Sequence, residues 1–174
     1  VKKVVEEVLS DLPSAPPAKM HTLFSILGRQ KVEERDLRNW LTDIAEHGNK
    51  EQRILLVRNL DHATNRNPVL MLEMLSKCVS MEKELDSRMT HDVSFILHLI
   101  LEHSGKIDKG PLELLRDELL RKLMDIPKLD WYADELLRFC LTGIDSAINF
   151  LEHRLKKSIG RKRRGDKSEA FEAV

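Results

Sequence analysis

Two histidines and a glutamate have the spacing of metal ligands on one face of a predicted helix. His91 and His98 are seven residues apart, and Glu102 follows His98 by four, so that a helix places all three roughly on one side. Zinc, however, needs three or four ligands with supporting groups behind them. No further helix that would supply ligands is evident, and the apolar stretch around His98 is typical of a core histidine. We expect no metal ion and no cofactor.

The motifs of familiar enzyme classes are absent from the sequence. Neither G-x-S-x-G nor G-x-x-x-x-G-K-[ST] occurs, and the glycines of segment 105–110 follow no predicted strand and have no Ser or Thr after a Lys, so a loop is favoured there. Paired acids at 6–7 and 33–34 fall on first turns or exposed faces of helices, where they stabilise the helix dipole. We expect neither enzymatic activity nor a small-molecule substrate.

The two cysteines, Cys78 and Cys140, each lie inside an apolar helical pattern with no partner at metal-ligand spacing. Free cysteines of this kind are typically buried as small hydrophobic residues in a reducing compartment. We expect neither a disulfide nor a nucleophile at these positions.

The charge of the chain is unevenly distributed. The 29 Lys and Arg residues balance 29 Asp and Glu residues, for a formal net charge of zero. Segment 154–167 nevertheless holds eight basic residues and one acidic residue, a local charge of +7, which leaves −5 on residues 1–153 and −2 on residues 168–174. The neutral total therefore combines an acidic body with a basic C-terminal run.

A basic run of this kind is typical of a nuclear-import signal or of a contact to nucleic acid. No aromatic residue interleaves with the bases, which argues against recognition of single strands by stacking. The alternative is a solvated helix end followed by a passive linker. The residues expected to act in import or in nucleic-acid contact are Lys156, Lys157, Arg161, Lys162, Arg163 and Arg164.

A second, smaller group of basic residues surrounds the fourth predicted helix. In a helical stack, loops and first helices of successive pairs line one concave face, which often binds a peptide or phosphate. The alternative is scattered solvated charge beside Glu51 and Asp61. The residues that would contribute to such a face are Lys50, Arg53, Arg58 and Arg66.

Helices must position all of these groups, because apolar residues recur at spacings of three and four along the whole chain and no strand pattern occurs. Glycines and prolines stand at the ends of the periodic segments. The sixth segment is apolar nearly all round and is predicted to be central. The predicted helices span 2–12, 18–29, 33–47, 50–63, 68–81, 85–104, 111–126, 130–142 and 144–157.

These elements predict an all-α fold of eight or nine helices. The favoured architecture is an irregular right-handed α-α superhelix, a HEAT-like stack of helical hairpins, since short loops make consecutive helices antiparallel neighbours. A closed helical bundle is the alternative, and the absence of a fixed period argues against a regular solenoid. The expected organisation is an N-terminal helix with a Pro-rich linker (1–17), a helical interaction domain (18–157) and a flexible basic tail (158–174).

The many amphipathic helices and the lack of enzyme motifs favour a non-enzymatic protein-interaction domain that acts as a scaffold or adaptor. Because the chain has Val at both ends and no initiator Met, we expect it to belong to a larger protein, and the basic run indicates a nuclear one. It would bind a peptide or helix of a protein partner, or associate with itself, for example as a homodimer. The alternative is an RNA- or DNA-binding helical domain that uses the basic tail and the 50–66 cluster. No apolar stretch approaches the roughly 18 residues that span a bilayer, and we expect no membrane contact.

Overall fold

The computed structural model describes residues 2–10, 14–82, 87–104, 118–123 and 148–156. Every regular element within these ranges is a helix and none is a strand, which confirms the predicted all-α fold for this part of the chain. Residues 118–123 and 148–156 are helical, and six further helices precede them. These are α1 (Lys2–Ser10), α2 (Pro17–Arg29), α3 (Glu34–His47), α4 (Lys50–Ala63), α5 (Pro68–Ser80) and α6 (Ser87–Ser104).

The six helices start and end within two residues of the predicted positions, and side-chain caps mark the starts of two of them. Asn49 caps α4: its side chain accepts a hydrogen bond from the backbone N–H of Gln52, while the Gln52 side chain accepts one from that of Asn49, which forms a capping box. Asn67 likewise caps α5, which begins with Pro68. The predicted helix 130–142, most of 111–126 and residues 144–147 and 157 of the last predicted helix lie outside the described residues.

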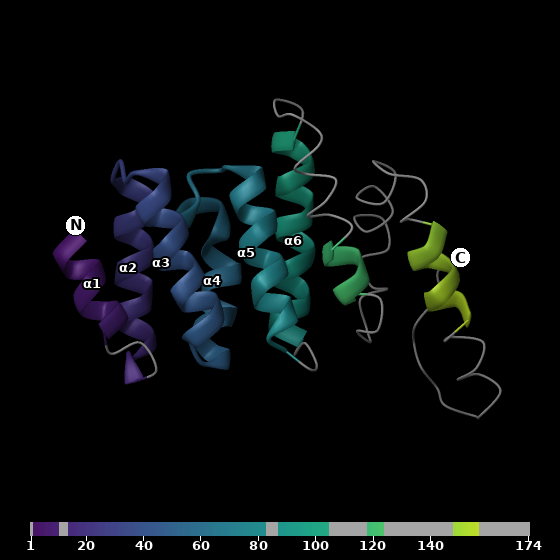
Figure 1. The fold of residues 1–174 in the computed structure, drawn as a ribbon, viewed down its shortest axis with the longest axis horizontal. Coiled ribbons are helices and arrows are strands. Elements are labelled where there is room, and N and C mark those ends of the chain that lie inside the picture. Colours follow the sequence, from purple (N-terminus) through teal and green to yellow (C-terminus); the bar gives the residue numbers. More distant parts are fainter. Residues whose placement is uncertain (1, 11–13, 83–86, 105–117, 124–147, 157–174) are drawn as a thin grey trace.

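The helices form two layers. One layer is α2, α4 and α6, in which α4 packs on both neighbours, and the other is α1, α3 and α5, in which α3 packs on both. Figure 1 shows the helices following one another in chain order along the long axis, with α1 at one end and residues 148–156 at the other. This arrangement is an open stack. The right-handed superhelical twist of a HEAT-like protein stays a prediction.

Among the described helices, α4 has the most neighbours. It packs against α2, α3, α5 and α6, and its consecutive residues Ile54 to Val57 are all buried. Helix α6 packs on α4 and α5, and Phe95 in its middle is 53% exposed. Most of the chain that follows α6 lies outside the described residues, so the central position expected for α6 stays a prediction.

The turn between α4 and α5 is tightly wound. Asn65 and Arg66 both adopt positive φ values, 51° and 60°, which cost energy for residues that carry a Cβ atom. The backbone N–H of Arg66 donates to the carbonyl of Asp61, and that of Asn65 donates to the carbonyl of His62. This is the Schellman pattern of a helix C-terminus, and it directs the chain straight into the Asn67 cap.

Candidate functional site

An open groove runs between α1 and α2 at the first end of the stack. We call it the α1/α2 groove; its volume is about 320 Å³ and its walls are mostly apolar. The lining residues are Val4, Glu7, Val8, Ala18, Lys19, Thr22, Leu23 and Ile26.

The groove exists because each helix turns only part of its apolar surface inward. On α1, Val5 and Val8 join the common core, while Val4 remains 46% exposed. On α2, Leu23 is buried in the core, whereas Ile26, one turn further along, is only partly buried. The apolar side chains left outside the core form the two walls.

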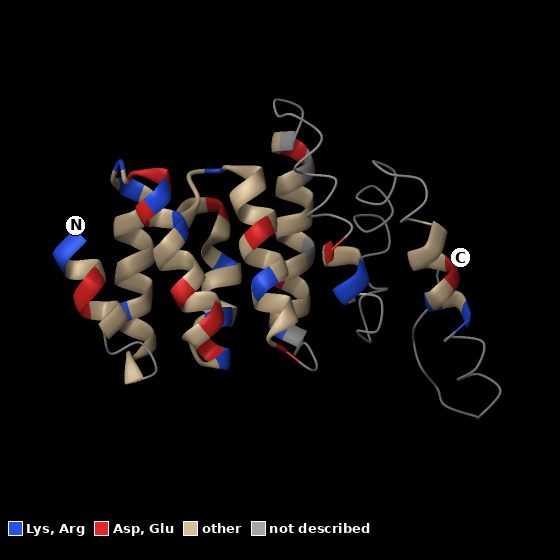
Figure 2. Cartoon of the chain, in the orientation of Figure 1, with Lys and Arg blue, Asp and Glu red and all other residues tan. Residues whose placement is uncertain are grey.

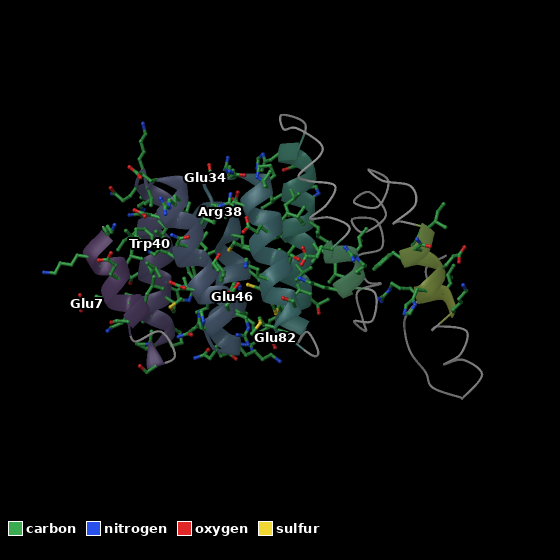
Figure 3. All side chains as sticks on the ribbon, viewed as in Figure 1. Glu7, Glu34, Arg38, Trp40, Glu46 and Glu82 are labelled. Atoms are coloured by element: carbon green, nitrogen blue, oxygen red, sulfur yellow. The ribbon has the colours of Figure 1, made fainter. Side chains whose placement is uncertain are left out.

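Two charges of opposite sign stand in the groove walls. Glu7 comes from α1 and Lys19 from α2, and both side chains are exposed; Figure 3 shows Glu7 at the outer end of the stack. The groove is thus an apolar trough with one acidic and one basic residue.

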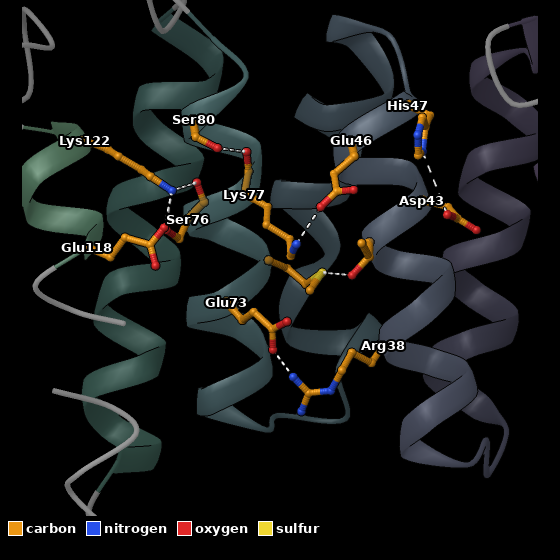
Figure 4. A network of polar contacts seen from close by, with 12 residues as sticks. Arg38, Asp43, Glu46, His47, Glu73, Ser76, Lys77, Ser80, Glu118 and Lys122 are labelled. Carbon is orange, nitrogen blue, oxygen red and sulfur yellow. Dashed lines mark hydrogen bonds and ion pairs between the residues drawn. The ribbon is translucent and has the colours of Figure 1, made fainter. Parts of the chain in front are cut away.

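The outer surface of α3 and α5 is different, because its charges are paired with one another. Arg38 forms an ion pair with Glu73, and the Nζ atom of Lys77 lies 2.6 Å from Oε1 of Glu46 (Figure 4). The hydrogen bond from Lys77 holds the pKa of the Glu46 carboxyl below its ordinary value. These contacts tie the two helices together.

The four residues proposed for a basic concave face are not gathered into one patch. Lys50 is exposed at the start of α4 and Arg66 lies beyond its end, separated by about 20 Å of helix at 1.5 Å per residue. Figure 2 shows acidic and basic residues interspersed over the helices. A binding role for these four residues stays a prediction.

Each of the three arginines in that set faces a carboxylate. Nε of Arg53 lies 2.7 Å from Oε1 of Glu82, with both side chains largely buried, and the same arginine donates to the carbonyl of Gly48. Arg58 pairs with Asp92 at 3.2 Å, and Arg66 lies 3.4 Å from Asp61. Arg53 therefore fastens the start of α4 to the residues that follow α5, which is a structural role.

The basic run begins with a residue that belongs to the fold. Arg154 is buried; its guanidinium donates a hydrogen bond of 3.2 Å to the carbonyl of Leu123 and lies 5.7 Å from the centre of the Phe150 ring. In the sequence this arginine is the first residue of the basic run 154–167 and lies within the helix predicted over 144–157. The available signal was the spacing of four between Phe150 and Arg154, which places both on one helical face.

Of the six proposed import or nucleic-acid residues, one lies in the described part of the chain. Lys156 is exposed at the end of helix 148–156, and its Nζ atom lies 3.2 Å from Oε2 of Glu152. Lys157, Arg161, Lys162, Arg163 and Arg164 lie outside the described residues. Their role, and with it nucleic-acid binding and nuclear import, stays a prediction.

Helix 148–156 exposes the face that its sequence pattern predicted to be buried. Ile148 and Leu155 are 48% and 46% exposed, while Leu151 between them is partly buried. The face that packs inward carries Phe150 and Arg154, because the core contact is made there.

The histidine pattern on α6 forms no cluster. His98 was expected in the core, but 42% of its side chain is exposed, and its Nε2 atom lies 3.4 Å from Oε1 of Glu102. Within the ranges that the structure describes, no group of three or more His, Cys, Asp or Glu side chains is placed to hold a metal ion.

Cys78 is a free, fully buried cysteine, as predicted. Burial raises the pKa of its thiol to about 12, and a protonated thiol is a poor nucleophile. Cys140 lies outside the described residues. None of the described helices has the length and apolar character needed to cross a bilayer.

Comparisons with protein-family models, curated proteins and solved structures found no match to this chain. The geometry of the described residues is therefore the basis for any statement about function.

Proposed function

We propose that this chain is a non-enzymatic protein-interaction domain that receives an amphipathic helix or peptide of a protein partner in the α1/α2 groove. One observation carries the proposal: an open, mostly apolar trough lies between two helices. A helix-in-groove partner presents apolar side chains at spacings of three, four and seven. Val4, Val8, Leu23 and Ile26 offer the apolar walls that such side chains need.

The dimensions of the groove favour a helix over a small molecule. Its volume of about 320 Å³ is at the lower end of the roughly 300–1,000 Å³ of small-molecule pockets, which also enclose most of their ligand. The walls are two helices with an open side, and a third helix packs between two others by fitting its ridge into their groove.

Selection from a displayed library of amphipathic helices tests this proposal on the full chain. We expect enrichment of helices with apolar residues at positions i, i+3 or i+4, and i+7. These helices should bind the wild type at least tenfold more tightly than an Ile26→Glu variant. Ser25→Glu is the matched control, because Ser25 is exposed on the same helix and does not line the groove. Absence of enriched helices, or equal binding to Ile26→Glu, would contradict the proposal.

We further propose that the domain acts as a scaffold or adaptor in a larger nuclear protein, with the basic run as its import signal. The support is the sequence charge of +7 over residues 154–167. A cytosolic reporter fused to residues 154–167 should accumulate in the nucleus, and the same reporter with Arg161 to Arg164 changed to Ala should not. A reporter that remains cytosolic would remove this part of the proposal.

A further inference from the structure

Two arginines, one on α4 and one in the turn after it, are held by carboxylates that lie deeper than the arginines themselves. The Arg58 side chain is 48% exposed, whereas that of its partner Asp92 on α6 is 11% exposed. The Arg66 side chain is 64% exposed, and that of its partner Asp61 is 16% exposed. Each pair therefore has its positive group at the surface and its negative group beneath it.

A histidine lies between the two arginines. His62 follows Arg58 by four residues, which places both on one face of α4, about 6 Å apart along the helix. Its side chain is 70% exposed, and its Nδ1 atom lies 3.9 Å from Oδ2 of Asp61. Because Asp61 also faces Arg66, it brings His62 and Arg66 together at the end of the helix. We call Arg58, His62 and Arg66 the α4 basic row.

Both arginines keep hydrogen-bond donors for a ligand. Arg58 donates to Asp92 through Nε, at 3.2 Å, and its two terminal nitrogens have no partner among the described residues. The contact of Arg66 with Asp61 is an ion pair without a hydrogen bond, since Oδ1 of Asp61 accepts none there. A guanidinium group presents its donors as a fixed fork that fits a carboxylate. Because the deeper acids already orient both groups, a ligand restricts few further rotamers.

An exposed aromatic side chain extends this surface onto α6. Helices α4 and α6 pack together and run in the same direction, as the two ion pairs between them show. Phe95 follows Asp92 by three residues, which places it about one turn further along the face of α6 that contacts Arg58. The same step along α4 leads from Arg58 to His62. Phe95, which is more than half exposed, therefore adds an apolar surface at the level of His62.

These groups suit a carboxylate-bearing peptide better than a nucleic acid. The two arginines and their acidic partners sum to zero charge, so the surface lacks the uncompensated positive field that attracts a polyanion. Affinity for nucleic acid also grows with the number of phosphates that are neutralised, and the row offers two arginines. Two carboxylates of a peptide can each receive one guanidinium fork, and aromatic residues such as Phe95 are enriched in protein interfaces.

We infer that the α4 basic row, together with Phe95, binds an acidic segment of a protein partner. Two Asp or Glu carboxylates of that segment contact Arg58 and Arg66, and an apolar side chain contacts Phe95. No residue of the row lines the α1/α2 groove. The inference therefore goes beyond the proposed function and concerns a second surface of the same domain.

Selection from a displayed library of random peptides on the full chain provides the probe. We expect the enriched peptides to contain at least two acidic residues and one large apolar residue. Fluorescence anisotropy then measures the affinity of a selected peptide. Arg66→Gln, and Arg58→Lys, which keeps the charge without the fork, should each weaken binding about tenfold, the loss expected for one charge-assisted hydrogen bond.

Two control variants separate the row from general attraction of acidic peptides to positive charge. Arg35→Gln removes an exposed arginine from α3, in the other layer, and should leave the affinity unchanged. Changing Arg161 to Arg164 to Ala removes charge from the basic run and should also leave it unchanged. Far-ultraviolet circular dichroism checks that each variant is folded. If Arg58→Lys is not, Phe95→Ala replaces it, with a loss of affinity expected there too.

Four outcomes would overturn the inference: no enrichment of acidic peptides, equal affinity of the wild type and the row variants, a loss as large in either control variant, or tighter binding of an oligonucleotide that depends on Arg58 and Arg66. Competition relates this surface to the groove. A library helix selected for the groove should not displace the acidic peptide, and displacement would overturn this inference while supporting the groove. Failure of the library helices to bind would overturn the proposed function alone.

Discussion

Gln52, near the start of α4, holds Ala15 in the segment that leads into α2: its Nε2 atom donates a hydrogen bond of 3.1 Å to the Ala15 carbonyl. The same buried side chain accepts the backbone N–H of Asn49 at 2.8 Å. One side chain thus satisfies the cap of α4 and positions the segment that enters α2, which forms one wall of the groove.

Gln52→Leu should lower the free energy of unfolding by about 1–3 kcal/mol, because it removes the two hydrogen bonds to the Asn49 N–H and the Ala15 carbonyl, and each such bond contributes about 0.5–1.5 kcal/mol. Urea denaturation measures the change. Glu51→Gln is the control, since Glu51 pairs with Arg88 only at the exposed surface, and it should change the value by less than about 1 kcal/mol. Equal effects of the two substitutions would contradict the role of Gln52.

Gly48→Ala should destabilise the chain by about 1–3 kcal/mol through overpacking. A Cβ atom at position 48 would lie 2.4 Å from the carbonyl oxygen of Ile44, which is backbone and cannot move aside alone. Gly28→Ala is the comparison: there the nearest atom is Cβ of His62 at 3.2 Å, and its effect should be the smaller one. Thermal denaturation gives the order of stability of the two variants. A larger loss of stability for Gly28→Ala would contradict the prediction.

Arg66→Gly should be more stable than Arg66→Ala by roughly 0.5–1 kcal/mol. Both substitutions remove the contact with Asp61, but only glycine relieves the left-handed backbone at φ 60°. That conformation costs a residue with a Cβ atom about 1–2 kcal/mol, part of which the greater freedom of glycine in the unfolded chain offsets. Chemical denaturation of the two variants measures the difference in their free energies of unfolding. A more stable Arg66→Ala variant would contradict strain at position 66.

Arg154→Ala should cost about 2–3 kcal/mol, since a hydrogen bond from a charged donor contributes about 1.5–3 kcal/mol and the contact with Phe150 is lost too. Lys156→Ala, two positions on and exposed, should change the free energy of unfolding by less than about 0.5 kcal/mol. Scanning calorimetry compares the stability of the two variants. Equal stability would show that Arg154 is not held in the fold.

Cys78 should react with a thiol reagent at pH 8 only when the chain unfolds. Its thiol pKa of about 12 keeps it protonated, and burial blocks access. In a Cys140→Ser variant only Cys78 can react, and its labelling should be at least a hundredfold slower in buffer than in denaturant. The ordinary pKa of a free thiol is about 8.5, so the unfolded state loses the proton first, and the contribution of Cys78 to stability should decline from about pH 8.5 toward pH 12. Fast labelling in buffer would contradict its burial.

The helices could be predicted from the sequence because their signals are local. Asn49 with Gln52, and Asn67 with Pro68, mark two helix starts by residue type alone. The spacing of apolar residues identified the remaining segments, and the burial of Cys78 followed from its apolar surroundings.

The functional surfaces could not be predicted in the same way, because they depend on which neighbours a helix acquires. Val4 and Leu155 fit the same periodic pattern as Val5, yet only Val5 is covered. The pairing of Arg53 with Glu82 joins residues 29 positions apart, which no spacing rule anticipates. The groove lies between two helices, so the sequence of either helix alone does not predict it.

The layered order of the helices also governs how the chain acquires its structure. Each helix packs mainly against those one or two places away along the chain, so most contacts close short loops, and folding of such chains is fast. Stability is then a sum of neighbouring contacts, and α1 packs on two of the described helices whereas α4 packs on four. We therefore expect α1, which carries one wall of the groove, to open before α4.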